Sequence, residues 1–105
     1  MTARNIKLIL QYDGTNYSGW QIQPGRPTIQ GLILEFLTRL EGRPVVLHGA
    51  GRTDAGVHAL NQVANFLTEK SISCRQLLRA INANLPYDIR VTSVEEVGAD
   101  FHARY

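Results

Sequence analysis

The residues from Thr28 to Leu40 constrain the fold most strongly, because their apolar side chains recur at helical spacing. Positions i, i+3, i+4, i+7, i+8 and i+11 form one stripe along an α-helix. The stripe consists of Ile29, Leu32, Ile33, Phe36, Leu37 and Leu40. Thr28 is a suitable N-cap and Gly42 a suitable C-terminal stop. We therefore predict a helix that packs this stripe against a second apolar layer.

The other periodic segments predict that second layer to be a β-sheet. Alternating or β-rich patterns predict strands over residues 5–12, Val45–His48 and 89–97. The stretch 60–68 fits either a helix or a strand, and its Asn and Thr residues favour the strand. A second helix, from about Arg75 to Asn84, has Ser73 as its cap. The order β-α-β-β-α-β predicts an α+β, ferredoxin-like fold, an antiparallel sheet with two helices on one face.

Length and composition are those of one folded domain spanning residues 1–105. The formal net charge of +2 and the pI near 9.0 are compatible with a nucleic-acid partner but do not establish one. A single cysteine, Cys74, excludes an internal disulfide and favours a reducing compartment. No apolar run approaches the ~20 residues of a membrane span, so we expect no membrane contact and a cytoplasmic location.

The stretch Gly49–Leu60 is small, polar or charged, and lies between two apolar runs. Glycine is favoured where the backbone turns or approaches a ligand closely. On composition alone this is a turn in which Asp54 bonds its own backbone. Its chemical interpretation is a carboxylate nucleophile or base, Asp54, kept ionised by Arg52. His58 we expect to be structural, with contact to RNA as the alternative.

Three other site chemistries fit the sequence poorly. The histidines and Cys74 lack the spacing of a zinc site, so no metal is expected. Gly49-Ala50-Gly51 and Glu69 have the spacing of a dinucleotide site, but Asp54 occupies the third glycine position, where it would repel a pyrophosphate. A hydrolytic carboxylate pair lacks a second acid close in sequence. We expect no cofactor.

The segment before the first helix offers a second set of candidate RNA contacts. Trp20, Gln21 and Arg26 combine an aromatic ring, an amide and a cation, which are groups that stack on bases and bind phosphates. The alternative is that Trp20 pins this loop to the core, since Trp is mostly buried. Arg75 and Arg79 share one helix face, which is more typical of a solvated surface than of a phosphate contact.

Four motifs together resemble one known family. They are Tyr12-Asp13-Gly14-Thr15 with Gly19-Trp20-Gln21 and Gln23, Gly51-Arg52-Thr53-Asp54-Ala55-Gly56-Val57-His58-Ala59, Asn82-Ala83-Asn84-Leu85-Pro86, and Phe101-His102-Ala103-Arg104. In this order they resemble the TruA family of tRNA pseudouridine synthases. The resemblance implies a ferredoxin-like fold and uridine isomerisation in the anticodon arm of tRNA, at positions 38 to 40.

The same resemblance implies roles for residues of the Gly-rich loop. Asp54 corresponds to the catalytic aspartate, and Arg52 to an arginine that helps the target nucleotide leave its stack. Gly51, Thr53, Gly56 and His58 are expected beside the substrate. Family members carry a second domain and an active-site tyrosine that this chain lacks, and they act as homodimers. We therefore expect an N-terminal domain with little turnover alone and an unpaired sheet edge.

Two other function classes remain open from the sequence. A non-catalytic RNA-binding module would use the same sheet to hold RNA, although the usual aromatic pattern is missing from 45–48 and 61–68. A regulatory or ligand-sensing domain has only the fold in its favour.

Overall fold

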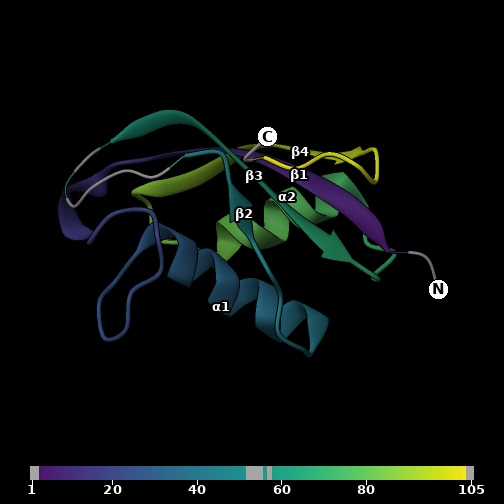
Figure 1. Ribbon diagram of the computed structural model, residues 1–105, viewed down its shortest axis with the longest axis horizontal. Helices are drawn as coiled ribbons and strands as arrows, with labels where there is room; N and C mark the ends of the chain where they lie inside the picture. Colours follow the sequence, from purple (N-terminus) through teal and green to yellow (C-terminus); the bar gives the residue numbers. More distant parts are fainter. Residues whose placement is uncertain (1–2, 52–55, 57, 104–105) are drawn as a thin grey trace.

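A four-stranded antiparallel sheet carries both α-helices against one of its faces (Figure 1). The computed structural model describes residues 3–51, 56 and 58–103. The elements, in order, are β1 (Arg4–Tyr12), the 3₁₀ turn η1 (Gly14–Asn16), α1 (Ile29–Glu41), β2 (His48–Gly49), β3 (Ala59–Thr68), α2 (Cys74–Ala83) and β4 (Ile89–Val97). The strand order β2-β3-β1-β4 confirms the predicted ferredoxin-like arrangement.

Strand β1 is central because it pairs antiparallel with β3 on one side and β4 on the other. Leu8, for example, lies opposite Ala64 and Val94. One face of β1 is buried, as the alternation predicted, and its side chains are Ile6, Leu8, Leu10 and Tyr12. On the other face Ile9 is half-buried and Gln11 is exposed. This second face is open over part of its length.

Helix α1 begins and ends where the sequence predicted. The Thr28 hydroxyl accepts a hydrogen bond from the Gly31 N–H, and Gly42 ends the helix in the left-handed conformation at φ 72°. Glycine adopts that conformation without the steric cost other residues incur. Of the predicted apolar stripe, the fully or nearly buried members are Ile29, Ile33, Phe36 and Leu37.

Helix α2 is confirmed within one residue at each end. Ser73 and Gln76 form a reciprocal capping box at its N-terminus. Leu77 and Ile81 are buried, whereas Arg75 and Arg79 on the outer face are exposed. The ambiguous segment 60–68 is a strand, as favoured, with Ala64 and Phe66 fully buried.

The prediction of a strand over Val45–His48 is wrong in its bounds, because β2 spans only His48–Gly49. The Gln30 amide donates to the Leu47 carbonyl at 2.8 Å, so a side chain of α1 occupies a backbone group that a strand would use. Leu47 is buried, but the neighbouring Val46 side chain is 68 % exposed. The β-rich composition therefore produces an extended segment attached to α1 instead of a longer sheet strand.

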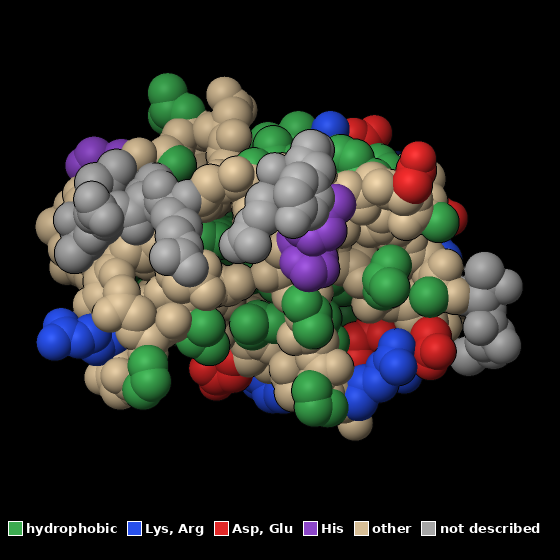
Figure 2. All heavy atoms as spheres, viewed as in Figure 1, with side chains coloured by type: hydrophobic (Ala, Val, Ile, Leu, Met, Phe, Trp, Pro, Cys, Tyr) green, Lys and Arg blue, Asp and Glu red, His purple; other side chains and the backbone are tan. Residues whose placement is uncertain are grey.

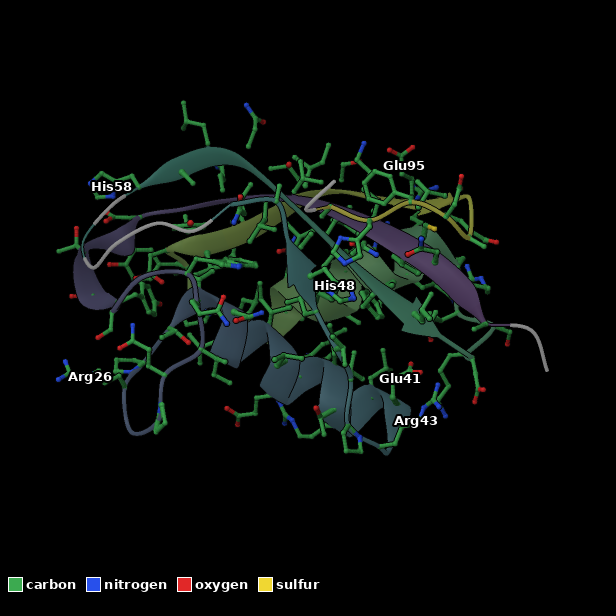
Figure 3. The ribbon with its side chains drawn as sticks, in the orientation of Figure 1. Arg26, Glu41, Arg43, His48, His58 and Glu95 are labelled. Atoms are coloured by element: carbon green, nitrogen blue, oxygen red, sulfur yellow. The ribbon has the colours of Figure 1, made fainter. Side chains whose placement is uncertain are left out.

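Polar side chains join the C-terminal end of α1 to the end of β3. The buried Glu41 carboxylate, at the end of α1, accepts from the Thr68 hydroxyl at 2.7 Å and from the Glu69 N–H at 3.4 Å. Figure 3 shows Arg43 beside Glu41, and its guanidinium also pairs with Glu69 at 3.4 Å. On the face of the molecule shown in Figure 2, Lys and Arg side chains lie among Asp and Glu side chains. The surface charge there is mixed in sign.

On the face of the sheet opposite the helices, the buried side-chain amides of Asn5 and Asn65 bind the segment that follows β4. Asn5 donates to the carbonyls of Gly98 and Phe101, each at 2.9 Å. Asn65 donates to the Asn5 side chain at 3.1 Å and accepts from the Ala103 N–H at 2.8 Å. The imidazoles of His48 and His102 lie beside this network, with ring centroids 4.0 Å apart. Residues 98–103 are thereby bonded to the centre of the sheet.

Gly49 is a position where the packing leaves no room for a side chain. Trp20 is only 1 % exposed, and its indole lies directly over the Gly49 Cα. A Cβ added to Gly49 would be 2.7 Å from Trp20 Cε2, closer than real Cβ atoms approach other heavy atoms. A Cβ on Gly51, two residues later, would meet nothing within 4 Å.

Gly49→Ala should therefore destabilise the fold, by about 1–3 kcal/mol, because the indole must shift within a packed core. The matched variant Gly51→Ala should change the free energy of unfolding by less than about 0.5 kcal/mol. Urea unfolding followed by Trp fluorescence measures both. Equal stability of the two variants would contradict the close packing of Trp20 on Gly49.

Candidate active site

The loop between β2 and β3 carries most of the residues that the sequence singled out. Arg52, Thr53 and Asp54 lie outside the described residues. What the structure describes is the two ends of this loop, through Gly51 on one side and from Gly56 and His58 on the other. These ends determine where the loop leaves and rejoins the sheet.

The first end of the loop is bonded to β3. The Ala50 N–H donates to the Val63 carbonyl at 2.8 Å, one residue beyond the β2–β3 ladder. The side chain of Gln62, which is nearly buried, donates to the Gly51 carbonyl at 2.6 Å. Together with the Gly49–Trp20 packing, these bonds fix the backbone up to Gly51.

The second end is bonded to the turn that follows β1. Gly56 has φ 79°, a conformation that favours glycine, and its N–H donates to the Tyr17 carbonyl at 3.2 Å. His58 Nδ1 lies 2.9 Å from the Gly14 N–H nitrogen and 3.1 Å from Asp13 Oδ1. These contacts are of the kind that the expected structural role of His58 requires.

A single nitrogen of His58 serves two partners of opposite kind. When neutral with its proton on Nε2, the ring accepts from the Gly14 N–H through Nδ1. When protonated, Nδ1 donates to the Asp13 carboxylate instead. Either state keeps the ring attached to the turn at residues 13–14, so this end of the loop stays joined to β1.

Asp13 is held as an anion by the turn that it caps. Its Oδ1 accepts from the Thr15 hydroxyl at 2.6 Å and from the Thr15 N–H at 3.0 Å. These two bonds lower the pKa of the Asp13 carboxyl below its ordinary value of 3.8, and the positive charge of His58 adds a smaller effect. An ionised carboxylate can only accept hydrogen bonds.

Tyr17 and Asp88 join the same turn to the start of β4. The Tyr17 hydroxyl donates to Asp88 Oδ1 at 2.6 Å, and the Asp13 N–H donates to the Asp88 carbonyl at 2.9 Å. Burial of the ring, followed by its bond to Asp88, raises the pKa of Tyr17 well above its ordinary value. The sequence analysis did not foresee this pair, because 71 residues separate its members and no local pattern links them.

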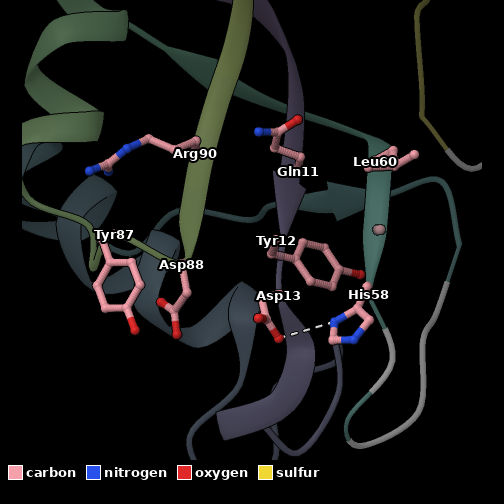
Figure 4. A pocket seen from close by; sticks show the side chains of 9 residues that line it. Gln11, Tyr12, Asp13, His58, Leu60, Tyr87, Asp88 and Arg90 are labelled. Atoms are coloured by element: carbon pink, nitrogen blue, oxygen red, sulfur yellow. Dashed lines mark ion pairs between the residues drawn. The ribbon is translucent and has the colours of Figure 1, made fainter.

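These bonds surround a hollow at the end of the sheet, which we call the sheet-end pocket (Figure 4). Its volume is about 390 Å³, within the range of small-molecule sites. It is lined by Gln11, Tyr12, Asp13, His58, Ala59, Leu60, Tyr87, Asp88 and Arg90. In Figure 4, Tyr87 stands on the β4 side and Leu60 on the β3 side, with Gln11 between them. Only His58 among these was a predicted site residue.

A second cavity, of about 450 Å³, lies along the first end of the loop. Trp20, Gln21 and Gly51 line it, so three predicted site residues meet there. The Trp20 ring, however, is buried and lies parallel to Tyr12, with ring centroids 6.2 Å apart. This favours the alternative in which Trp20 pins its loop to the core, because a buried ring has no face to offer a base.

Arg26 is not brought to either cavity. It is exposed in a small hairpin, where Gln23 and Arg26 pair, and it points away from the sheet (Figure 3). Within residues 3–51, 56 and 58–103, no group of three or more His, Cys, Asp or Glu side chains is arranged to hold a metal ion. No helix in the same part of the chain is long and apolar enough to cross a membrane.

The comparison with known families gives a decisive result. A family model described as tRNA pseudouridine synthase matches residues 8–105, which include the whole loop between β2 and β3. The chain belongs to the tRNA pseudouridine synthase family. The motif resemblance is thereby confirmed at the level of the family.

Individual members of this family are similar over almost the whole chain. A "tRNA pseudouridine synthase A" of Solibacter usitatus is 53 % identical over 97 % of the chain. Proteins of the same name are 54 % identical in Geobacillus kaustophilus, over the full chain, and 48 % identical in Lacticaseibacillus casei, over 96 %. The chain spans only 41 to 42 % of the length of these relatives.

Removing the Tyr17 hydroxyl tests the hydrogen bond between Tyr17 and Asp88. Tyr17→Phe should destabilise the fold by about 1.5–3 kcal/mol, the usual range for hydrogen bonds to charged groups. Tyr87→Phe is the matched control, because Tyr87 is 85 % exposed, and it should leave stability unchanged. Thermal unfolding followed by circular dichroism measures both, and a Tyr17→Phe protein as stable as the wild type would refute the role of this bond.

Alkaline pH tests the same bond without changing the side chain. The pKa of Tyr17 is raised in the folded state, so above its ordinary value of 10.0 the unfolded chain loses this proton before the folded chain does. Tyr17 therefore contributes stability that is complete below that pH and is lost as pH rises further. Urea unfolding at about pH 9 and about pH 11 should show a larger loss for the wild type than for Tyr17→Phe. A parallel loss in both proteins would contradict this expectation.

Proposed function

We propose that this chain is the part of a tRNA pseudouridine synthase that bears the catalytic aspartate, Asp54. The observation that carries the proposal is the family match over residues 8–105, a range that includes Gly51–Ala59. Relatives named tRNA pseudouridine synthase A are about half identical over this chain. Because the chain spans 41 to 42 % of their length, the activity belongs to a longer protein.

The proposed reaction is an isomerisation, so it requires no redox partner and no cofactor. The N1–C1′ bond of a uridine breaks, the uracil turns over, and a C5–C1′ bond forms. The proton on C5 leaves to solvent while N1 gains one, which balances the atoms and the electrons. Asp54 supplies a carboxylate that acts as nucleophile or base, and Arg52 supplies a cation beside it. The uridine must first leave its stack, because chemistry on a stacked base is blocked.

The geometry around the loop supports this role. One end of the loop is bonded to β3 through Gln62 and Gly51, and the other end is bonded to the turn after β1 through Tyr17 and Gly56. Catalytic side chains on loops depend on a rigid scaffold beneath them. The sheet-end pocket and the cavity beside Trp20 are lined by residues at the two ends of the loop, His58 at one end and Gly51 at the other.

The finer parts of the proposal follow the family resemblance. The substrates are uridines 38 to 40 in the anticodon arm, recognised mainly through shape and backbone charge. The complete protein has a second domain and forms a homodimer in the cytoplasm, and the active site lies in the cleft between its domains. The present chain supplies half of that cleft and should turn over slowly or not at all alone.

A non-catalytic RNA-binding module is the competing function. Ferredoxin-like sheets that bind RNA stack bases on aromatic side chains of their central strands. On the face of the sheet opposite the helices, and within the described residues, β1 carries Lys7, Ile9 and Gln11, and β3 carries Val63, Asn65 and Leu67. None of these is aromatic, so the geometry does not favour this function.

Release of tritium from tRNA labelled at C5 of uridine tests the synthase proposal. The wild-type chain extended through its second domain should release tritium, and the 105-residue chain alone should release little. Asp54→Asn in the extended protein should lower the rate by about 1,000-fold or more, since the loss of a catalytic group removes most of the chemistry. This variant changes few atoms and removes the charge.

Binding of tRNA by the same proteins provides the control. Asp54→Asn should bind tRNA as tightly as the wild type, or more tightly, because a negative charge near RNA is removed. Tritium release by Asp54→Asn at the wild-type rate would exclude Asp54 as the catalytic residue. Binding without release by every form would support the RNA-binding module instead.

A further inference from the structure

The sheet-end pocket has an exposed aromatic side chain that the proposed chemistry does not use. Tyr87 is 85 % exposed, and Leu60 on the opposite side of the pocket is 76 % exposed. Large hydrophobic side chains exposed around a hollow commonly mark a binding site. The pocket lies on the part of the sheet where β1 ends and β3 and β4 begin (Figure 4).

The charges of the pocket argue against a phosphate group as its occupant. Asp13 and Asp88 contribute two carboxylates, which would repel a phosphate. Arg90 is the one guanidinium among the lining residues, and its Nη1 already donates to the carbonyls of Asn82 and Ile89, each at 3.2 Å. The pocket therefore suits a group that carries no negative charge and donates hydrogen bonds.

The bases and sugars of RNA fit that description. A base offers a flat face to the Tyr87 ring, and N–H groups of the base and the ribose hydroxyl can donate to carboxylates. Each carboxylate retains acceptor capacity. A carboxylate accepts about four hydrogen bonds, and the bonds described above occupy only Oδ1 of Asp13 and of Asp88. Gln11, exposed between Tyr87 and Leu60, adds a further donor and acceptor.

We propose that the sheet-end pocket binds one unpaired nucleoside of the tRNA, with its base stacked on Tyr87 and its donor groups facing Asp13 and Asp88. This rests on the proposed function. His58, which lines the pocket, follows Asp54 by four residues, and four residues of chain span at most about 14 Å even when fully extended. The bound nucleoside is thus close in the RNA to the target uridine. Its role is to hold the anticodon arm in position while the target is unstacked.

Substitution of Tyr87 in the protein extended through its second domain tests the pocket. Tyr87→Ala should raise the Kd for an anticodon-arm hairpin by about 5-fold to about 100-fold, the usual effect of removing one base–aromatic stack. Tyr87→Phe keeps the ring and should stay within about 2-fold of the wild type. Leu67→Ala is the matched control, an exposed apolar residue on the same sheet that does not line the pocket. Fluorescence anisotropy at fixed salt measures all four proteins.

Salt dependence separates a base from a phosphate. The slope of log K against log salt reports the number of phosphates contacted, so Tyr87→Ala should weaken binding without changing the slope. A slope for Tyr87→Ala smaller than that of the wild type by about one would overturn the proposal that the pocket binds a base. A Kd for Tyr87→Ala equal to that of the wild type would overturn it too. Weakening by Tyr87→Phe as large as that by Tyr87→Ala would also overturn it, because the ring would then not matter.

The tritium assay keeps the two proposals distinguishable. Tritium release by the wild type with no effect of Tyr87→Ala on Kd would refute the pocket and leave the synthase proposal standing. Binding that depends on the Tyr87 ring, without tritium release by the wild type, would refute the synthase proposal and support the pocket. A wild-type protein that does not bind the hairpin would refute the pocket whatever the tritium assay shows.

Discussion

The packing of the Trp20 indole on Gly49 is the contact on which the arrangement of the candidate site depends. Trp20 also lies parallel to Tyr12 at the end of β1, and its carbonyl accepts from the Gln30 N–H at the start of α1. One residue thus joins the central strand and the start of the loop between β2 and β3 through its side chain, and the first helix through its backbone. Because the indole occupies the space of a side chain at position 49, glycine there is a condition of the packing and not only of the turn.

Polar bonds between distant segments also hold the residues around the loop in place. Tyr17 meets Asp88, Asp13 meets both His58 and Asp88, and Gln62 meets Gly51. These bonds converge on the end of the sheet where the loop leaves and rejoins it. Tyr17 and Gln62 are the buried members of this set, and breaking a bond of a buried polar group leaves that group unsatisfied. The fold therefore uses its long-range bonds where the proposed chemistry needs fixed backbone.

The sequence was sufficient for the elements whose signals are local. The apolar stripe of α1, its Thr28 cap and its Gly42 stop, and the Ser73 cap of α2 each lie within a few residues of the structure they specify. The extent of β2 was not predictable in this way, because the Leu47 carbonyl is bonded to Gln30, 17 residues earlier. β-propensity describes a residue's preference for extended backbone and does not say which group takes the hydrogen bond.

The candidate site also depends on contacts between residues far apart in sequence, which local patterns do not predict. The sequence identified the loop through its glycines, Arg52 and Asp54, but these residues reveal nothing about the pocket beside it. Tyr87, Leu60 and Gln11 belong to three different strands or their ends, and only the sheet register brings them together. For Trp20 the sequence left core and RNA contact open, and burial of the ring favours the core. Side-chain type alone does not distinguish a buried ring from an exposed one.

The distribution of charge bears on the proposed binding of RNA. The net charge is only +2, and several described cations are already paired, Arg4 with Glu96, Lys7 with Glu95 and Arg43 with Glu69. Pairing of this kind weakens the attraction for phosphates, which depends on cations that can replace counterions. Three of the nine described Lys and Arg side chains are paired in this way, and in the proposed complex stacking on exposed rings would add to the phosphate contacts of the others. Tyr87, exposed at the edge of a pocket with two carboxylates, is placed to make that kind of contact in the proposed complex.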